Sequence, residues 1–153
     1  MYYKLTFKLS TLFENDKMYI AHSFPYTTDK LYKFLDEKSS RNKDIVSRIT
    51  VGKTLSKRPI EGLIIGQNIN KKRDNRKAIF FMARQHPGEC QGSYVCEGVV
   101  ERLLSKTKES DFLLKNYIIY VIPMINPDGV VFGHYRTNLS GKDLNRKWNV
   151  TEK

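Results

Sequence analysis

His86 and Glu89 are the side chains whose types and spacing point most directly to chemistry. They stand three positions apart, with Pro87 and Gly88 between them, directly after an apolar run at residues 78–83. Imidazole nitrogen and carboxylate oxygen are both good zinc ligands, and a catalytic zinc typically takes three protein ligands and a water. A turn built on proline and glycine would let both side chains face one ion. The alternative, from this spacing alone, is a surface histidine in a turn beside a glutamate that starts a helix.

Three further motifs follow toward the end of the chain. An Asn-Pro-Asp-Gly segment lies at residues 126–129, a Tyr-Arg pair comes next, and Asp-Leu-Asn-Arg occupies residues 143–146. With the first motif, and in this order, they resemble the zinc carboxypeptidase family. The residues of these motifs are most similar to those of the cytosolic carboxypeptidases, the branch that trims glutamates from tubulin and other proteins. Residues 19–27 and 51–60 also resemble segments of that branch, so the resemblance covers nearly the whole chain.

The resemblance implies a role for each matching side chain. His86 and Glu89 would be ligands of one zinc ion. Arg136 would stabilise the oxyanion of the scissile carbonyl, because a fixed guanidinium suits developing negative charge. Asn145 and Arg146 would hold the free α-carboxylate of the substrate, as guanidinium offers a bidentate fork for carboxylate. The implied reaction is zinc-dependent hydrolysis of a C-terminal peptide bond, with glutamate as the residue removed.

The catalytic set that the resemblance implies is incomplete in this chain. The family's third zinc ligand is a histidine well after Asn-Arg, and its general base is a later glutamate; both fall beyond Lys153. Neither His22 nor His134 stands where the third ligand belongs. We therefore expect the first half of a catalytic domain, inactive in isolation. Asp143 and Trp148 are assigned to support and packing.

Two other functions stay open. The aspartoacylase-like branch uses a similar His-x-x-Glu and Asn-Arg pair to cleave the amide of a small acyl amino acid, but its metal motif usually carries Gly-Asn where this chain has Pro87-Gly88. Alternatively, a truncated, non-catalytic module would keep Asn145 and Arg146 with a basic face, and would bind acidic C-terminal tails without cutting them.

The formal net charge of the 153 residues is +11, which favours polyanionic partners. Acidic protein C-terminal tails, tubulin's among them, fit this charge. No zinc finger, RNP-like aromatic motif or heptad-bearing basic region is present, so no nucleic acid is expected. The basic run at residues 71–77 is expected to be a solvated loop, with a polyanion contact as the alternative.

Targeting features are also missing from the sequence. No signal peptide begins at Met1, and no apolar run reaches the roughly 20 residues that a membrane span needs. The only cysteines, Cys90 and Cys96, suit packing in a reducing compartment rather than a disulfide framework. These features predict a soluble, cytoplasmic protein with no membrane contact.

The elements that must position the motifs alternate between strand-like and helix-like segments. This order predicts an α/β/α domain with a mixed, largely parallel sheet. Apolar runs and helical spacing predict helices over 28–38 and 91–105 and strands over 62–66, 78–83 and 117–122. Because ligands bind at the carboxyl ends of strands in such sheets, the place of His86 after 78–83 favours a functional role.

The first residues of the chain carry a different pattern. Residues 3–9 alternate apolar and polar side chains, which predicts a half-buried strand. By resemblance, residues 1–26 are the last strands of a β-sandwich domain, and residues 27–153 are the N-terminal half of the zinc carboxypeptidase catalytic domain.

Overall fold

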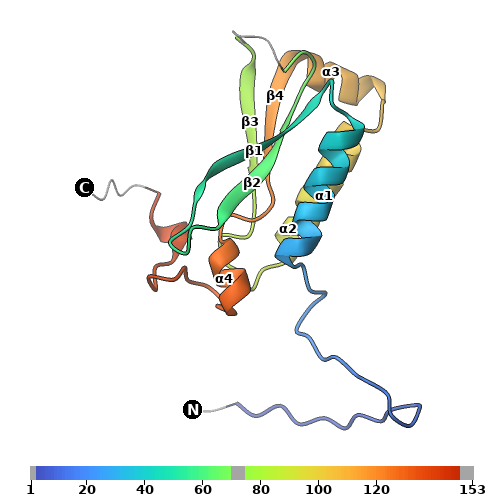
Figure 1. Cartoon of the computed structure of the whole chain (residues 1–153), viewed down its shortest axis with the longest axis vertical. Helices are drawn as coiled ribbons and strands as arrows, with labels where there is room; N and C mark the ends of the chain where they lie inside the picture. Colours follow the sequence, from blue (N-terminus) through green and yellow to red (C-terminus); the bar gives the residue numbers. More distant parts are fainter. Residues whose placement is uncertain (1–2, 70–74, 149–153) are drawn as a thin grey trace.

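The structure is a computed structural model that describes residues 3–69 and 75–148. Within that part, a mixed sheet has the strand order β1-β2-β4-β3 (Figure 1). The strands are β1 (Val46–Lys53), β2 (Pro59–Ile65), β3 (Lys77–Met82) and β4 (Tyr117–Ile122). β2 pairs antiparallel with both β1 and β4, whereas β3 and β4 run parallel. The expected α/β class with a mixed sheet is confirmed, and the parallel pairing is that of β3 with β4.

Two helices, α1 (Thr28–Arg41) and α2 (Gln91–Leu103), lie side by side against one face of the sheet (Figure 1). Ion pairs join them: Lys30 Nζ lies 3.1 Å from Glu97 Oε1, and Lys38 Nζ lies 2.6 Å from Glu101 Oε1. The core between helices and sheet is formed by buried aliphatic side chains that include Leu31, Leu35, Leu63, Ile65, Val100, Ile119 and Val121. Burial of these side chains is the main force that holds the helices on the sheet.

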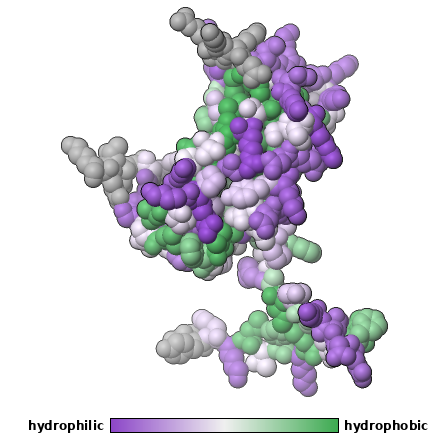
Figure 2. Space-filling view, viewed as in Figure 1, coloured by the Kyte–Doolittle hydropathy of each residue, from purple (hydrophilic) through white to green (hydrophobic). Residues whose placement is uncertain are grey.

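The remaining helical segments lie before and after β4 in the chain. α3 (Lys108–Asn116) leads into that strand, while α4 (Pro127–Phe132) and the 3-10 turn η1 (Leu144–Arg146) come after it. Figure 2 shows hydrophilic surface over the helical side of the molecule and apolar surface on the N-terminal segment. No helix of the described chain is both long and apolar enough to cross a bilayer.

Most of the predicted elements are present with small shifts in their ends. The helix predicted over 28–38 begins at Thr28, where Thr27 Oγ1 accepts a hydrogen bond from the Lys30 amide at 3.1 Å, and it runs on to Arg41. The strand predicted over 117–122 has those bounds. β1 and α3 were not predicted, because β1 mixes charged and apolar side chains along an edge strand and α3 is short.

The strand predicted over residues 3–9 is wrong for this structure. The segment has no regular secondary structure, its side chains are exposed, and it leads away from the body of the molecule (Figure 1). A strand needs a neighbour to pair its backbone groups, and none of the described residues pairs with this segment. The assignment of residues 1–26 to a β-sandwich and of 27–153 to a catalytic half-domain stays a prediction. Residues 70–74, most of the predicted basic loop, lie outside the described residues.

The Asn-Pro-Asp-Gly segment is the start of a short helix, α4. Asn126 is the N-cap of α4 and accepts a hydrogen bond from the Gly129 amide at 2.9 Å, and Pro127 occupies the first helical position. The helix ends at Gly133, whose φ of 75° is the left-handed conformation that glycine adopts most easily. The segment therefore sets both the start and the direction of α4.

Asp128 fastens α4 to the loop between β1 and β2. Its carboxylate, 2% exposed, accepts hydrogen bonds from Thr54 Oγ1 at 2.7 Å, from the Ser56 amide at 3.1 Å and from the Ser56 hydroxyl. Arg58 Nε lies 3.6 Å from the same carboxylate. Burial alone would raise the pKa of Asp128, but the hydrogen bonds from Ser56 and Thr54 and the charge of Arg58 outweigh it and lower the pKa. The charged form is thus part of the fold.

Asp128→Ala should lower the free energy of unfolding by about 3 kcal/mol, because it leaves buried donors without an acceptor. Since the folded pKa lies below the unfolded value, this stabilisation is present above about pH 4 and declines as the pH falls further. Urea denaturation at about pH 7 and about pH 3 should show a smaller difference from wild type in acid. Glu14→Ala, in the exposed N-terminal segment, is the control; an equal difference at both pH values would contradict the charged role.

Candidate active site

The metal motif lies at the carboxyl ends of the parallel strands β3 and β4. Hydrogen bonds continue past the strand ends: the Ala83 amide donates to Ile122 O at 3.0 Å, and the Ile125 amide donates to Ala83 O at 3.0 Å. The Asn126 amide then donates to Arg84 O at 3.2 Å. The loops that follow the two strands are therefore held together, as expected for a ligand site in an α/β sheet.

The Pro-Gly turn brings His86 and Glu89 to the same side. The Glu89 amide donates to His86 O at 3.1 Å, and the Gly88 amide donates to Tyr135 O at 2.8 Å. A Cβ atom at Gly88 would lie 2.4 Å from the Tyr135 ring, so only glycine fits against the loop that carries Arg136. The turn brings the His86 and Glu89 side chains together, and it also holds the loop that carries Tyr135.

His86 is 6% exposed, and both of its ring nitrogens are engaged. Nδ1 lies 2.9 Å from Glu89 Oε1, and Nε2 lies 3.0 Å from Asp143 Oδ1. An ionised carboxylate only accepts, so Asp143 places a proton on Nε2. The Nδ1 atom and the Glu89 carboxylate lie side by side, close enough for both to bind one cation. This donor set fits zinc, with Asp143 orienting the histidine from behind.

Asp143, expected only as a supporting residue, is the link between the ligand pair and the rest of the site. Its Oδ2 accepts from Arg136 Nε at 2.7 Å, and its Oδ1 also accepts from the Asn145 amide at 2.9 Å. The hydrogen bond with His86 is the largest effect on this carboxyl, and with Arg136 it lowers the pKa of Asp143 to about 2. One carboxylate thereby connects the histidine, the arginine and η1.

The predicted substrate residues differ in how closely they approach the ligand pair. Asn145 lines a cavity of about 400 Å³ together with His86 and Glu89. Its Oδ1 accepts from Trp148 Nε1 at 3.0 Å, which leaves the amide nitrogen as a donor. Arg146 is on the same turn but is exposed, and within the described residues its Nη1 donates to Asn145 O alone, at 3.2 Å. The structure thus brings Asn145 and Arg136 to the site and leaves Arg146 at its margin.

Two residues that position the site were not identified from the sequence. Buried Asn126 donates through Nδ2 to Gln85 O and Thr137 O, each at 3.2 Å, and so joins the loops on both sides of α4. Arg84 has a φ of 58° and donates through Nε to Pro87 O at 2.9 Å. Burial lowers the pKa of Arg84 from its ordinary value. Asn126 belongs to the Asn-Pro-Asp-Gly motif, to which no role in the site was given, and no motif marks Arg84.

The other candidate ligands are used locally. His134 Nδ1 lies 3.3 Å from Thr137 O, and His22 packs edge-on against the Tyr135 ring. Cys90 and Cys96 are free, buried thiols, and burial raises the pKa of Cys96 to about 11. Across residues 3–69 and 75–148, no group of three or more His, Cys, Asp or Glu side chains converges on one point. Within the described residues, His86 and Glu89 remain the two candidate ligands for a metal.

Comparison with known proteins decides the family. Residues 31–152 match the zinc carboxypeptidase family model. The chain belongs to the zinc carboxypeptidase family. It is 38% identical over 138 residues to cytosolic carboxypeptidase 6 of Caenorhabditis elegans, covering 90% of this chain and 30% of that protein. It is also 38% identical over 151 residues to cytosolic carboxypeptidase 2 of Danio rerio, covering 95% and 21% respectively.

A solved zinc carboxypeptidase relative supports the same fold. The metallo-carboxypeptidase from Burkholderia cenocepacia superposes with a TM-score of 0.72 at 30% identity, over 84% of this chain and 34% of that one. The chain therefore spans about a third or less of the length of these relatives. The sheet and the loops that carry His86, Glu89 and Asn145 lie within residues 31–152, the part of the chain that matches the family model.

If Asp143 orients His86 for metal binding, Asp143→Ala should raise the dissociation constant for Zn²⁺ about tenfold to a hundredfold. Isothermal titration of the protein with Zn²⁺ measures this change. His86→Ala should remove the site, and Asp111→Ala, on the exposed side of α3, should bind as wild type does. Unchanged zinc affinity in the Asp143 variant would show that the carboxylate does not support the ligand.

Proposed function

We propose that the protein is part of a zinc-dependent metallocarboxypeptidase that removes C-terminal residues, glutamate above all, from acidic protein tails. The observation that carries the proposal is the Asp143 carboxylate, which joins His86 at 3.0 Å to Arg136 at 2.7 Å. Asn145, two residues on, lines the cavity of the ligand pair. One hydrogen-bonded unit thus holds a metal ligand, an oxyanion donor and a carboxylate-binding motif.

His86 and Glu89 would hold the metal. A zinc ion bound there supplies polarisation of the scissile carbonyl and a more acidic water molecule. The buried position of His86 and its hydrogen bond to Asp143 keep the ring from rotating, so the ligand is oriented before metal arrives. No third ligand and no general base are proposed among the described residues, and residues 1–153 alone are expected to be inactive.

Arg136 would stabilise the oxyanion. Its Nε is held by Asp143, which fixes the plane of the guanidinium. Neither terminal nitrogen has a partner within the described residues, so both stay available for developing negative charge. A donor that is fixed before the reaction stabilises such charge without the cost of reorganisation.

Asn145 and Arg146 would bind the α-carboxylate of the substrate. With Asn145 Oδ1 occupied by Trp148, the amide presents its NH₂ group, and the exposed Arg146 guanidinium can add a bidentate contact. A site that requires a free carboxylate selects the chain terminus. This requirement makes the reaction that of an exopeptidase.

The net charge of +11 supports acidic tails as substrates, since a basic surface attracts them over long range. Tubulin tails are the example that the cytosolic branch suggests. The names of the cytosolic relatives support a cytosolic location. Nucleic acid and membranes are not proposed as partners.

A second candidate function is a module that binds acidic tails without cutting them. It is favoured by the two-ligand metal site of the described residues. Incubating the longer protein with zinc and a glutamate-tailed peptide separates the two functions, because a binding module would release no glutamate. Glutamate release by this chain alone would refute its expected inactivity. Preferential cleavage of an N-acyl amino acid by the longer protein would instead favour aspartoacylase-like chemistry.

Arg146→Ala should raise the dissociation constant of a peptide with a free C-terminal glutamate about tenfold or more, because a charged hydrogen-bond pair is lost. Binding of the same peptide with an amidated C-terminus should be weak and unchanged. Fluorescence anisotropy of labelled peptides measures both constants. Arg41→Ala, at the exposed end of α1, is the matched control, and equal losses on both peptides would contradict the carboxylate-binding role.

A further inference from the structure

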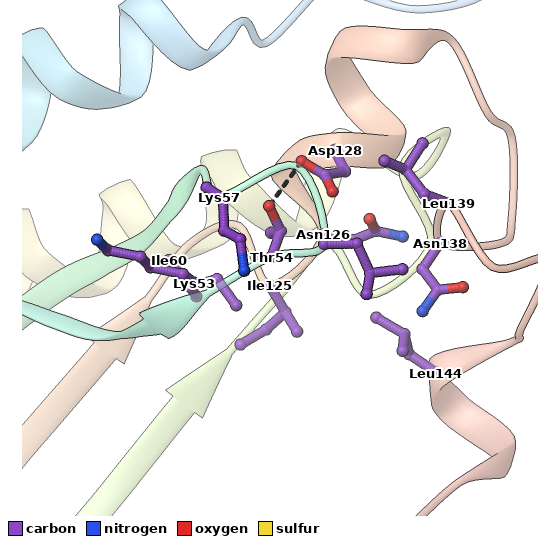
Figure 3. A pocket seen from close by; sticks show the side chains of 11 residues that line it. Lys53, Thr54, Lys57, Ile60, Ile125, Asn126, Asp128, Asn138, Leu139 and Leu144 are labelled. Carbon is purple, nitrogen blue, oxygen red and sulfur yellow. Dashed lines mark hydrogen bonds between the residues drawn. The ribbon is translucent and has the colours of Figure 1, made fainter.

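A second cavity, of about 420 Å³, lies beside the active site between the β1–β2 loop and the loop that precedes η1 (Figure 3). Leu144 lines this cavity, and the next residue, Asn145, lines the cavity of the metal ligands. The two cavities are therefore neighbours across η1. A peptide bound at one could reach the other without leaving the surface.

Two lysines give this cavity its charge. Lys53 and Lys57 line it, both are exposed, and neither ammonium forms an ion pair within the described residues. In Figure 3 the Lys57 side chain points into the cavity beside Thr54. The one carboxylate in the lining, Asp128, is already bonded to Thr54 and Ser56 and faces Arg58, so it does not neutralise the lysines.

The backbone at Lys57 is in an unusual conformation. Its φ is 66°, a region that glycine or asparagine occupies at lower cost than lysine. The Lys57 amide donates to Thr54 O at 3.0 Å, which holds this residue at the tip of the β1–β2 loop. A charged side chain at a strained position is an observation that motivates a functional role.

The opposite wall adds a neutral donor. Asn138 Oδ1 accepts from the Ser140 amide at 3.0 Å, from Ser140 Oγ at 2.9 Å and from the Lys142 amide at 3.0 Å. Its amide nitrogen is therefore the group left to bind a ligand, across the cavity from Lys57 (Figure 3). Leu139, Ile60 and Ile125 complete the wall with apolar surface.

We propose that this cavity binds an acidic side chain of the substrate tail, upstream of the residue that is removed. This proposal rests on the proposed function, in which Asn145 and Arg146 of η1 bind the terminal carboxylate in the neighbouring cavity. Lys57 and Asn138 supply the donors for a carboxylate, Lys53, whose ammonium points away from Asn138 in Figure 3, adds positive charge, and the apolar wall suits the methylene groups of glutamate. Among the described residues that line the cavity there is no aromatic side chain, so they offer no stacking platform for a nucleic-acid base.

The test compares two peptides that both end in a free glutamate, one with three glutamates before it and one with three glutamines. Wild-type protein should bind the glutamate peptide more tightly by anisotropy. The double variant K53E/K57E should lose about tenfold in affinity for the glutamate peptide and little for the glutamine peptide. The control K43E/K115E makes the same change in charge at the other end of the sheet, in the α1–β1 loop and near the end of α3, and should bind as wild type does.

The outcomes separate this proposal from the proposed function. If wild type binds both peptides equally, or if K53E/K57E weakens both equally, the acidic side-chain site is refuted, while Arg146→Ala still tests the terminal-carboxylate site. If amidation of the C-terminus has no effect but the glutamate preference disappears in K53E/K57E, the side-chain site stands and the exopeptidase function fails. A single-stranded RNA oligonucleotide that binds more tightly than the glutamate peptide, through the same lysines, would also overturn the proposal.

Discussion

The parallel pairing of β3 with β4 is the constraint on which the site depends. Its hydrogen bonds do not stop at the strand ends, because Ala83 remains bonded to both Ile122 and Ile125. The two loops therefore leave the sheet as a joined pair. The metal loop, residues 83–90 between β3 and α2, and the segment that leads into α4 therefore start at a fixed separation. Every contact of the site depends on that separation.

Beyond these two loops, the other parts of the site are held in place by hydrogen bonds from single polar side chains. Asn126 ties the metal loop to the loop after α4, and Asp143 ties His86 to Arg136 and η1. Each of these groups meets several partners at once, so its loss would disturb more than one element. The candidate site is rigid because a few buried or half-buried polar atoms are shared, rather than because each residue has its own support.

The sequence predicted the elements whose patterns are local and strong. β4 was located with its bounds, since an unbroken apolar run precedes a proline, and α1 followed from the spacing of Leu31, Phe34 and Leu35. The motifs named His86 and Glu89, and the structure brings their side chains together. The prediction of a strand at residues 3–9 was wrong, because alternating apolar and polar side chains do not show whether a neighbouring strand is present to pair with. The hydrogen bond between Asp143 and His86 could not be predicted from the sequence either, since the two residues are 57 positions apart with no periodic pattern between them.

The strand order also has a consequence for the synthesis of the chain. β4, the last strand to be translated among those described, takes an interior place between β2 and β3. Until residues 117–122 have left the ribosome, β2 and β3 each present an unpaired edge, and such edges invite wrong association. The metal loop, although it is translated earlier, has nothing to be held against during that interval. Assembly of the site therefore waits for the synthesis of residues 117–122, because the two loops cannot be held together before that strand is in place.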